Sequence, residues 1–288
     1  MKDRFTKQWI IQNSIDICSR YEHGVLTLRS LHYQLVGIGM TNDIQHYKRV
    51  VNAMIDARWS GEISFDQFSD LDRSMVGETK YKETILEDQI EQGQHQVEAW
   101  MTAYRKNRWE NQPIYPEVLI EKKALQGVFA PICNKMDVSM GACKGYPSLT
   151  FLNEMASRFR GIDKSIVLIY FGDYDPSGED IPRSIVENLK RFGVEVELQR
   201  IALMEHQVIT WNLPPAPAKT TDSRTAKWDG LGQVELDAVK PEDLQTLCRK
   251  SIESLFDEEL YKELIEQEKE ERLQYQSILK QFVNNIKD

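Results

Sequence analysis

Apolar residues in the N-terminal part of the chain recur at helical spacing, in three runs that turn-forming residues separate. The runs cover residues 5–21, 28–36 and 43–59, and Thr27 stands where the second run would need an N-cap. Polar and apolar residues then alternate from Gly61 to Phe65, which predicts a short strand. Three helices followed by a short β segment have the element order of a winged helix.

The pattern changes at Pro116, where apolar runs of strand length begin to alternate with amphipathic helical runs. The expected strands are residues 116–122, 138–144, 165–175 and 194–201. The expected helices are residues 124–136, 148–160 and 178–192. Strands and helices in alternation predict a parallel sheet whose strands are joined by helical crossovers.

We therefore expect an α/β protein with a helical N-terminal domain, a second domain with a mainly parallel sheet, and C-terminal helices. A length of 288 residues fits two domains. The expected boundaries are 1–80 for a winged-helix domain, 81–115 for a polar helical connector, 116–245 for the α/β domain and 246–288 for an acidic helical tail.

The net charge of −9 argues against a protein that coats nucleic acid without specificity, because such binding depends on cationic groups that displace counterions. The charge is unevenly distributed along the chain. Residues 1–60 carry eight Lys and Arg against five Asp and Glu, whereas residues 251–288 carry five against ten. The N-terminal domain can therefore still face a phosphate backbone.

The sequence shows no feature of a membrane or secreted protein. Its longest apolar run, Ile166 to Phe171, is far shorter than the roughly 18 residues of a spanning helix. The residues after Met1 lack the apolar core of a signal peptide, and the four cysteines lack the close spacing of a zinc site or redox dithiol. We therefore expect a cytoplasmic protein with reduced thiols and no membrane partner.

The segment from Ile166 to Gly178 places two carboxylates at the end of an apolar strand. Asp173 and Asp175 are separated by one residue, so both can point into the crevice where open α/β sheets bind ligands. Glu121 ends an earlier strand and reaches the same crevice if the two strands are neighbours. Three close carboxylates repel one another unless a cation joins them, and hard oxygen ligands favour Mg²⁺.

The alternative interpretation of this segment is an ordinary strand-to-helix turn, because Asp, Pro, Ser and Gly are common turn formers. In that case the acidic residues are solvated or cap the next helix. The Glu-Lys pair at 121–122, about fifty residues earlier in the chain, favours the metal site.

The Glu121 element, the Asp-x-Asp-Pro-x-Gly run at 173–178 and the order of strands and helices resemble the Toprim domain of topoisomerases, primases and related nucleases. A closer resemblance is to the A subunit of topoisomerase VI and its relatives, which include the meiotic break-making transesterase and the short Mini-A proteins of mobile elements. Residues 233–239 resemble the Glu-Leu-Asp-Ala-Leu signature that follows the Toprim core in such proteins. The resemblance covers roughly residues 20–245.

In that family a helix of the winged-helix domain carries an arginine and, four residues later, the tyrosine that attacks DNA. Arg29 and Tyr33 have this spacing, which places them on one helical face, where the guanidinium can steady a phosphate. Tyrosine needs such help because its ordinary pKa near 10 makes it a poor nucleophile at neutral pH. The family often has Tyr-Tyr where this chain has His32-Tyr33. The alternative is that Tyr33 is an amphipathic core residue and that His32 is structural.

Six further cations are candidate contacts to DNA phosphates, with a solvated protein surface as the alternative. Four belong to the N-terminal domain, and two follow the prolines of the loop at residues 211–229. They are Lys48, Arg49, Arg58, Arg73, Lys219 and Arg224.

The resemblance implies a Mg²⁺-dependent transesterase of double-stranded DNA that forms a 5′-phosphotyrosyl link. It also implies a homodimer, in which the tyrosine of one protomer meets the metal site of the other. The chain has no P-loop, so strand passage would require a separate ATPase subunit. Two alternatives remain open: a metal-dependent nuclease that uses water as its nucleophile, and a non-catalytic DNA-binding or regulatory protein on the same fold.

Overall fold

A computed structural model of the chain describes residues 4–69, 85–215 and 232–286. The chain forms two compact units, each built from two separate segments. The first unit comprises Met1–Arg73 and Ile114–Leu255, and the second comprises Ser74–Pro113 and Phe256–Asp288. No helix in the described part of the chain combines the length and the apolarity that crossing a membrane requires.

The N-terminal part of the first unit consists of three helices, α1 (Lys7–Cys18), α2 (Leu28–Gly37) and α3 (Ile44–Trp59). Each begins at a polar residue whose side chain accepts a hydrogen bond from the first helical turn, namely Thr6, Thr27 and Asp43. The helices enclose an apolar core that includes Leu26, Leu31, Leu35, Val50 and Met54. The prediction of three helices in this part of the chain is therefore confirmed.

The prediction of a strand from Gly61 to Phe65 is wrong, because these residues form turns and a short irregular stretch. Ile63 is buried against the helical core, whereas Phe65 is 58% exposed and packs edge-on against Trp59. The alternation thus reflects one apolar side chain buried in a turn, and no strand among the described residues pairs with this segment. Nearby, a single β-bridge joins Leu26 and Phe68.

The second part of the first unit contains a four-stranded sheet in which every pair of neighbours is parallel, as the alternation of strands and helices predicts. The strands are β1 (Ile114–Ile120), β2 (Ser139–Ala142), β3 (Ser165–Phe171) and β4 (Glu197–Ala202), in the order β2-β1-β3-β4. The connecting helices are η1 (Lys123–Leu125), α5 (Gln126–Lys135), α6 (Leu149–Phe159) and α7 (Pro176–Arg191).

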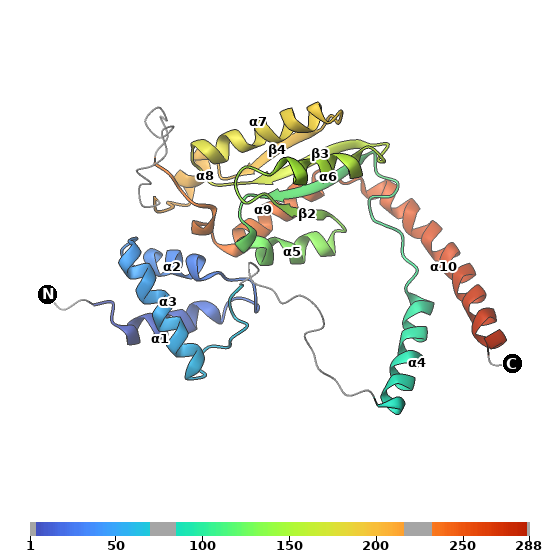
Figure 1. Ribbon diagram of the computed structural model, residues 1–288, viewed down its shortest axis with the longest axis horizontal. Coiled ribbons are helices and arrows are strands. Elements are labelled where there is room, and N and C mark those ends of the chain that lie inside the picture. The colour runs from blue at the N-terminus through green and yellow to red at the C-terminus, as the bar shows by residue number, and fades with distance from the viewer. Residues whose placement is uncertain (1–3, 70–84, 216–231, 287–288) are drawn as a thin grey trace. The chain divides into compact units, whose positions relative to one another are not determined.

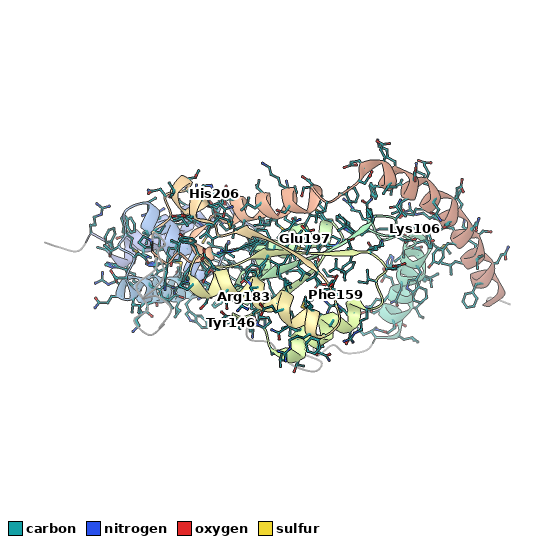
Figure 2. All side chains as sticks on the ribbon, turned by 90° about the horizontal axis from the view of Figure 1, so that it is seen from above. Lys106, Tyr146, Phe159, Arg183, Glu197 and His206 are labelled. Carbon is teal, nitrogen blue, oxygen red and sulfur yellow. The ribbon has the colours of Figure 1, made fainter. Side chains whose placement is uncertain are left out.

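Helices cover both faces of this sheet, which explains why β3 is an unbroken apolar run. Figure 1 shows α7 and α5 on opposite sides of the strands. Leu168 and Tyr170 pack with α6 and α7 on one face, while the Phe171 ring lies 4.7 Å from the Phe129 ring of α5 on the other. Arg183 is exposed on the amphipathic helix α7 (Figure 2). It bonds to Asp180 and Glu187 of the same helix.

After β4 the chain forms α8 (Glu205–Thr210), the short helix η3 (Leu236–Ala238) and α9 (Pro241–Glu253). The η3 segment packs against α2, and Thr27 donates a hydrogen bond to Asp237 at 3.4 Å. A second close contact lies at Gly127, where a Cβ would come within 2.1 Å of the carbonyl oxygen of Gly24. The backbones of the three-helix part and the sheet part therefore approach each other closely at this point.

The second unit pairs α4 (Leu86–Thr102) and the residues that follow it with α10 (Glu258–Ile286). The backbone N–H of Lys106 donates to Glu268 at 2.8 Å, and Gln112 exchanges two hydrogen bonds with the backbone of Asp257. Three large apolar side chains of α10 are more than half exposed, namely Leu273, Ile278 and Phe282. The second unit thus combines most of the expected connector with the part of the acidic tail from Phe256 onward, whereas residues 246–255 belong to the first unit.

Glu117 is a carboxylate of β1. Among the described residues, a single cation neutralises its charge. Glu117 is 1% exposed, and it accepts two hydrogen bonds from Nη2 of Arg158 in α6, at 2.7 and 2.9 Å. Burial raises the pKa of Glu117, and the charge of Arg158 opposes that change.

We expect Arg158→Ala to lower the free energy of unfolding at pH 8 by about 2 kcal/mol, because it leaves a buried carboxylate without its cation. The double variant with Glu117→Gln should regain most of this loss, since an amide needs no countercharge. Denaturant unfolding of the two variants and the parent measures both effects. A double variant no more stable than Arg158→Ala would contradict this assignment.

Candidate functional site

The candidate site lies at the carboxyl ends of β1 and β3, the two central strands. The chain leaves β1 toward β2 on one side and leaves β3 toward β4 on the other, and open α/β sheets bind ligands at such a point. Glu121 directly follows β1, and Asp173 lies two residues beyond β3. The two strands are neighbours, which is the condition under which Glu121 and Asp173 come together.

Glu121 and Asp173 interact through the backbone as well as through their charges. The Glu121 carboxylate accepts hydrogen bonds from the backbone N–H of Asp173 at 2.9 Å and from the Tyr170 hydroxyl at 3.4 Å. A Cβ on Gly172 would lie 2.6 Å from that hydroxyl oxygen and 2.8 Å from the carboxylate. Glycine at this position therefore allows Glu121 to approach the end of β3.

The acidic pair is strongly perturbed. Burial raises the pKa of Asp173 to about 7; Lys122 opposes this change, and the negative charge of Glu121 adds to it. Burial also raises the pKa of Glu121, and the charge of Asp175 raises it further. Carboxylates in such a setting attract any cation that can reach them.

Lys122 supplies the positive charge at this site. Its Nζ atom lies 2.9 Å from an oxygen of Asp237, 3.1 Å from one of Asp173 and 3.5 Å from one of Glu235. Burial opposes its charge, but the surrounding carboxylates together raise its pKa well above the ordinary range of lysine. The ammonium group therefore remains charged and links the β3 end to the η3 segment.

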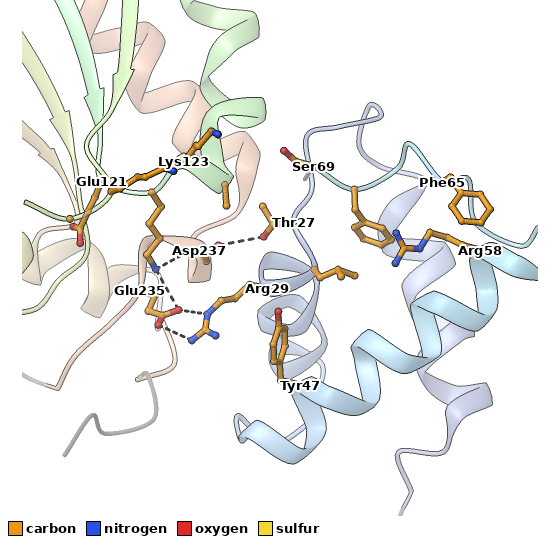
Figure 3. A pocket seen from close by; sticks show the side chains of 16 residues that line it. Thr27, Arg29, Tyr47, Arg58, Phe65, Ser69, Glu121, Lys123, Glu235 and Asp237 are labelled. Atoms are coloured by element: carbon orange, nitrogen blue, oxygen red, sulfur yellow. Dashed lines mark hydrogen bonds and ion pairs between the residues drawn. The ribbon is translucent and has the colours of Figure 1, made fainter. Parts of the chain in front are cut away.

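Glu235 connects this cluster to α2. Nη2 of Arg29 donates to one oxygen of Glu235 at 2.7 Å, and Nε of Arg29 donates to the other in a close contact (Figure 3). The Tyr33 hydroxyl also donates to Glu235, at 3.3 Å. The sequence interpretation assigned no role to Glu235 or Asp237, although both belong to the signature at 233–239 and, like Asp173 and Asp175, are separated by one residue.

Arg29 and Tyr33 share a face of α2, with the guanidinium carbon 5.9 Å from the centre of the Tyr33 ring. The same guanidinium lies 5.6 Å from the centre of the Tyr47 ring. Tyr33 is 4% exposed. Burial, together with the charge of Glu235, raises the pKa of its hydroxyl above the ordinary value, and Arg29 and Lys122 oppose this change. In this arrangement Tyr33 is a protonated hydrogen-bond donor.

Asp175 has a local role that differs from those of Glu121 and Asp173. It is the N-cap of α7, and its Oδ1 accepts a hydrogen bond from the backbone N–H of Gly178 at 2.7 Å. Within the described ranges, no set of three or more Asp, Glu, His or Cys side chains is arranged to hold a metal ion. The oxygen donors of Glu121 and Asp173 suit Mg²⁺ in their chemistry, but Lys122 provides the countercharge in this geometry.

A cavity of about 1090 Å³ opens beside the cluster, between the helical part and the sheet part of the first unit. Its lining is rich in cations and aromatic rings (Figure 3). The cations are Arg29, Arg58, Lys122, Lys123 and Lys144, and the aromatic residues are Tyr47, Phe65 and Phe68. We call this cavity the basic cleft.

The cations proposed for DNA contact have different positions. Arg58 lines the basic cleft, where its guanidinium carbon lies 5.6 Å from the centre of the Phe68 ring. Lys48 and Arg49 are exposed on α3 and do not line the cleft; Arg49 lines a separate cavity of about 360 Å³. The other three candidates lie outside the described residues: Arg73, Lys219 and Arg224.

In comparisons with known proteins, no family model matches the chain and no curated protein matches its sequence. The topoisomerase VI A resemblance therefore rests on the motifs alone.

His32 lies beside the candidate nucleophile and is 3% exposed. Its ring centre is 6.0 Å from that of Tyr33 and 5.6 Å from that of Tyr47. Burial, with a smaller contribution from the charge of Arg29, lowers the pKa of His32 from 6.5 to about 4. The folded protein therefore holds this imidazole in its neutral form at neutral pH.

This lowered pKa predicts that acid destabilises the fold through His32. Between pH 6.5 and 4 the unfolded chain binds a proton that the folded chain excludes, so stability falls as the pH falls through this window. Relative to His32→Leu, the parent should lose about 2 kcal/mol more between these pH values. His206→Gln, which changes an exposed histidine of α8 (Figure 2), should keep the parental pH dependence of unfolding. Equal slopes for His32→Leu and the parent would refute this assignment.

Proposed function

We propose that this chain is a DNA-cleaving tyrosine transesterase in which Tyr33 attacks a phosphodiester and forms a 5′-phosphotyrosyl link. One observation carries the proposal. Arg29 and Tyr33, from the helical part of the first unit, both bond to Glu235, which shares Lys122 with the acidic residue Asp173 of the sheet. A candidate nucleophile, a phosphate-binding cation and a perturbed acidic cluster thus occupy one site.

The basic cleft supports DNA as the substrate. Five Lys and Arg side chains line it against three carboxylates, those of Glu121, Glu235 and Asp237, so the lining has a net charge of +2 although the whole chain has one of −9. Such a local concentration of cations attracts a polyanion in spite of an acidic remainder. Aromatic side chains at the same wall can pack against sugars or exposed bases.

The chemistry follows from the side chains at the site. The Tyr33 oxygen forms a bond to phosphorus, the bond from phosphorus to the 3′ oxygen breaks, and the strand leaves with a free 3′-hydroxyl. Arg29 stabilises the charge that develops on the phosphoryl oxygens. Mg²⁺, held by Glu121 and Asp173 with Asp175 beside them, would neutralise phosphate charge when bound. Reversal of the same exchange reseals the strand.

The proposal extends to the architecture and the partners. We assign the three helices to a winged-helix type of DNA-binding domain and the sheet part to a Toprim domain. By the same resemblance the active form is a homodimer, and strand passage would depend on a separate ATPase subunit. These assignments rest on the motifs at 121, 173–178 and 233–239 together with the parallel sheet.

A hydrolytic nuclease is the second candidate function. The observation that favours it is the state of Tyr33, which is buried, hydrogen-bonded and harder to deprotonate than a free tyrosine. In such an enzyme a water molecule would attack the phosphodiester at the acidic cluster, and Tyr33 would be structural.

Tyr33→Phe separates the two functions, because it deletes the attacking oxygen and keeps the ring. We expect the covalent protein–DNA adduct and strand cleavage to disappear together, while stability changes by no more than about 1 kcal/mol for one lost hydrogen bond. Denaturing electrophoresis with labelled supercoiled DNA and Mg²⁺ detects both. Cleavage that continues without an adduct would establish the nuclease instead.

Asp173→Asn tests the metal assignment independently of cleavage. We expect it to weaken Mg²⁺ binding, measured by calorimetry, by at least about tenfold. Glu187→Gln, which changes an exposed acid of α7, should bind Mg²⁺ like the parent. Unchanged Mg²⁺ affinity in Asp173→Asn would remove Asp173 from the metal site. No binding by the parent would favour a non-catalytic DNA-binding role.

If Asp173→Asn, like Tyr33→Phe, abolishes cleavage, mixing the two variants tests whether two protomers share one active site. If Tyr33 of one protomer serves the acidic cluster of the other, a mixed dimer of Tyr33→Phe and Asp173→Asn has one site with both groups intact and regains cleavage. If each chain uses its own tyrosine, the mixture remains inactive.

A further inference from the structure

The Arg29–Glu235 pair has the geometry of a guanidinium bound to an oxyanion. Nε and Nη2 of Arg29 donate to the two oxygens of one carboxylate, which is the two-point arrangement that arginine also makes with a phosphate. The Arg29 side chain is 38% exposed and lines the basic cleft, whereas the Glu235 side chain is 8% exposed. Both residues line the basic cleft, and the carboxylate is the more deeply buried of the two, so the exposed part of the guanidinium is open to a ligand in the cleft.

Glu235 has other partners that can hold it once Arg29 is withdrawn. Lys122 lies 3.5 Å from Glu235 Oε2, and the Tyr33 hydroxyl donates to that same oxygen. Loss of Arg29 would therefore not leave the carboxylate as an isolated buried charge, which would be strongly destabilising. The exchange of one anion for another on Arg29 is therefore feasible at this site.

We infer that Glu235 is an internal substitute for a DNA phosphate, which holds Arg29 in the absence of DNA and exchanges with a phosphodiester that enters the basic cleft. This inference rests on the proposed function, since it takes a phosphodiester as the ligand. In the absence of DNA the site is then self-inhibited. Arg29 is bonded to Glu235, and the Tyr33 hydroxyl is held as a hydrogen-bond donor to the same carboxylate.

The exchange also gives Glu235 a chemical role. Without Arg29 the carboxylate is less stabilised as an anion and becomes a better acceptor for the Tyr33 proton. As the Tyr33 oxygen bonds to phosphorus, its proton passes to Glu235. The bond to the 3′ oxygen breaks, and the departing oxygen takes a proton from water. The arriving phosphate would thereby prepare the nucleophile that attacks it.

Non-covalent DNA binding tests the exchange without any need for cleavage. All measurements use the full chain carrying Tyr33→Phe in EDTA, with a fluorescent DNA duplex titrated over a range of salt concentrations. Glu235→Gln should tighten binding about tenfold near 0.1 M salt, because Arg29 is no longer occupied. The slope of log affinity against log salt should steepen by about 0.9, the value for one additional phosphate contact.

Two matched variants distinguish this exchange from a general loss of negative charge. Glu187→Gln removes an exposed carboxylate of α7 that does not line the cleft, and it should leave the salt slope unchanged. In an Arg29→Gln background, Glu235→Gln should no longer tighten binding. A tightening that persists without Arg29, or an unchanged affinity in Glu235→Gln, would overturn the inference.

A measurement on the unsubstituted chain covers the case in which Glu235→Gln does not fold. The Nε–H signal of Arg29 in an NMR spectrum, assigned from its absence in Arg29→Lys, should shift when the duplex is added. A fixed Arg29 signal in a chain that binds the duplex would overturn the exchange alone. A chain that neither binds nor cuts DNA would overturn the proposed function as well.

Discussion

The arrangement of the site depends on the ammonium group of Lys122. It lies within 3.5 Å of carboxylate oxygens from Asp173, Glu235 and Asp237, which follow β3 or belong to the η3 segment. Carboxylates buried together would repel one another or take up protons if no cation stood among them. Burial raises the pKa of Asp173 to about 7 even with Lys122 in contact, and the charge of Glu121 adds to this change. The carboxylates of the cluster therefore attract a further cation, whether a metal ion or an arginine side chain.

The join between the helical part and the sheet part of the first unit is made by polar groups as well as by close backbone packing. Thr27 bonds to Asp237, Arg29 bonds to Glu235, and Gly127 approaches the carbonyl of Gly24. The position of Tyr33 relative to the acidic residues therefore depends on the charged groups that bind Glu235. A ligand that alters these charged contacts acts directly on the join, because an ion pair responds to a new charge far more than an apolar contact does.

The elements of this fold were predictable where local pattern decides them. The three N-terminal helices and the parallel sheet follow from apolar periodicity and from the alternation of strands and helices, whereas the adjacency of β1 and β3 depends on a strand order that this pattern does not fix. The failed strand at Gly61–Phe65 shows the limit, since alternation does not reveal whether a partner strand exists. The role of Glu235 could not be predicted for a related reason. Its contact with Arg29 joins residues 206 positions apart, and no local sequence pattern indicates such a contact.

The second unit brings together two segments that are far apart in the chain. Gln112 bonds to the backbone of Asp257, which lies 145 positions later, and Tyr104 packs against Tyr275 of α10. The intervening segment contains the sheet and both of its acidic strand ends. During synthesis α4 must wait for its partner helix until the sheet-forming segment has emerged, so this unit closes late in folding. On the ribosome, the residues that follow α4 therefore remain without their contacts to Asp257 and Tyr275 throughout that interval.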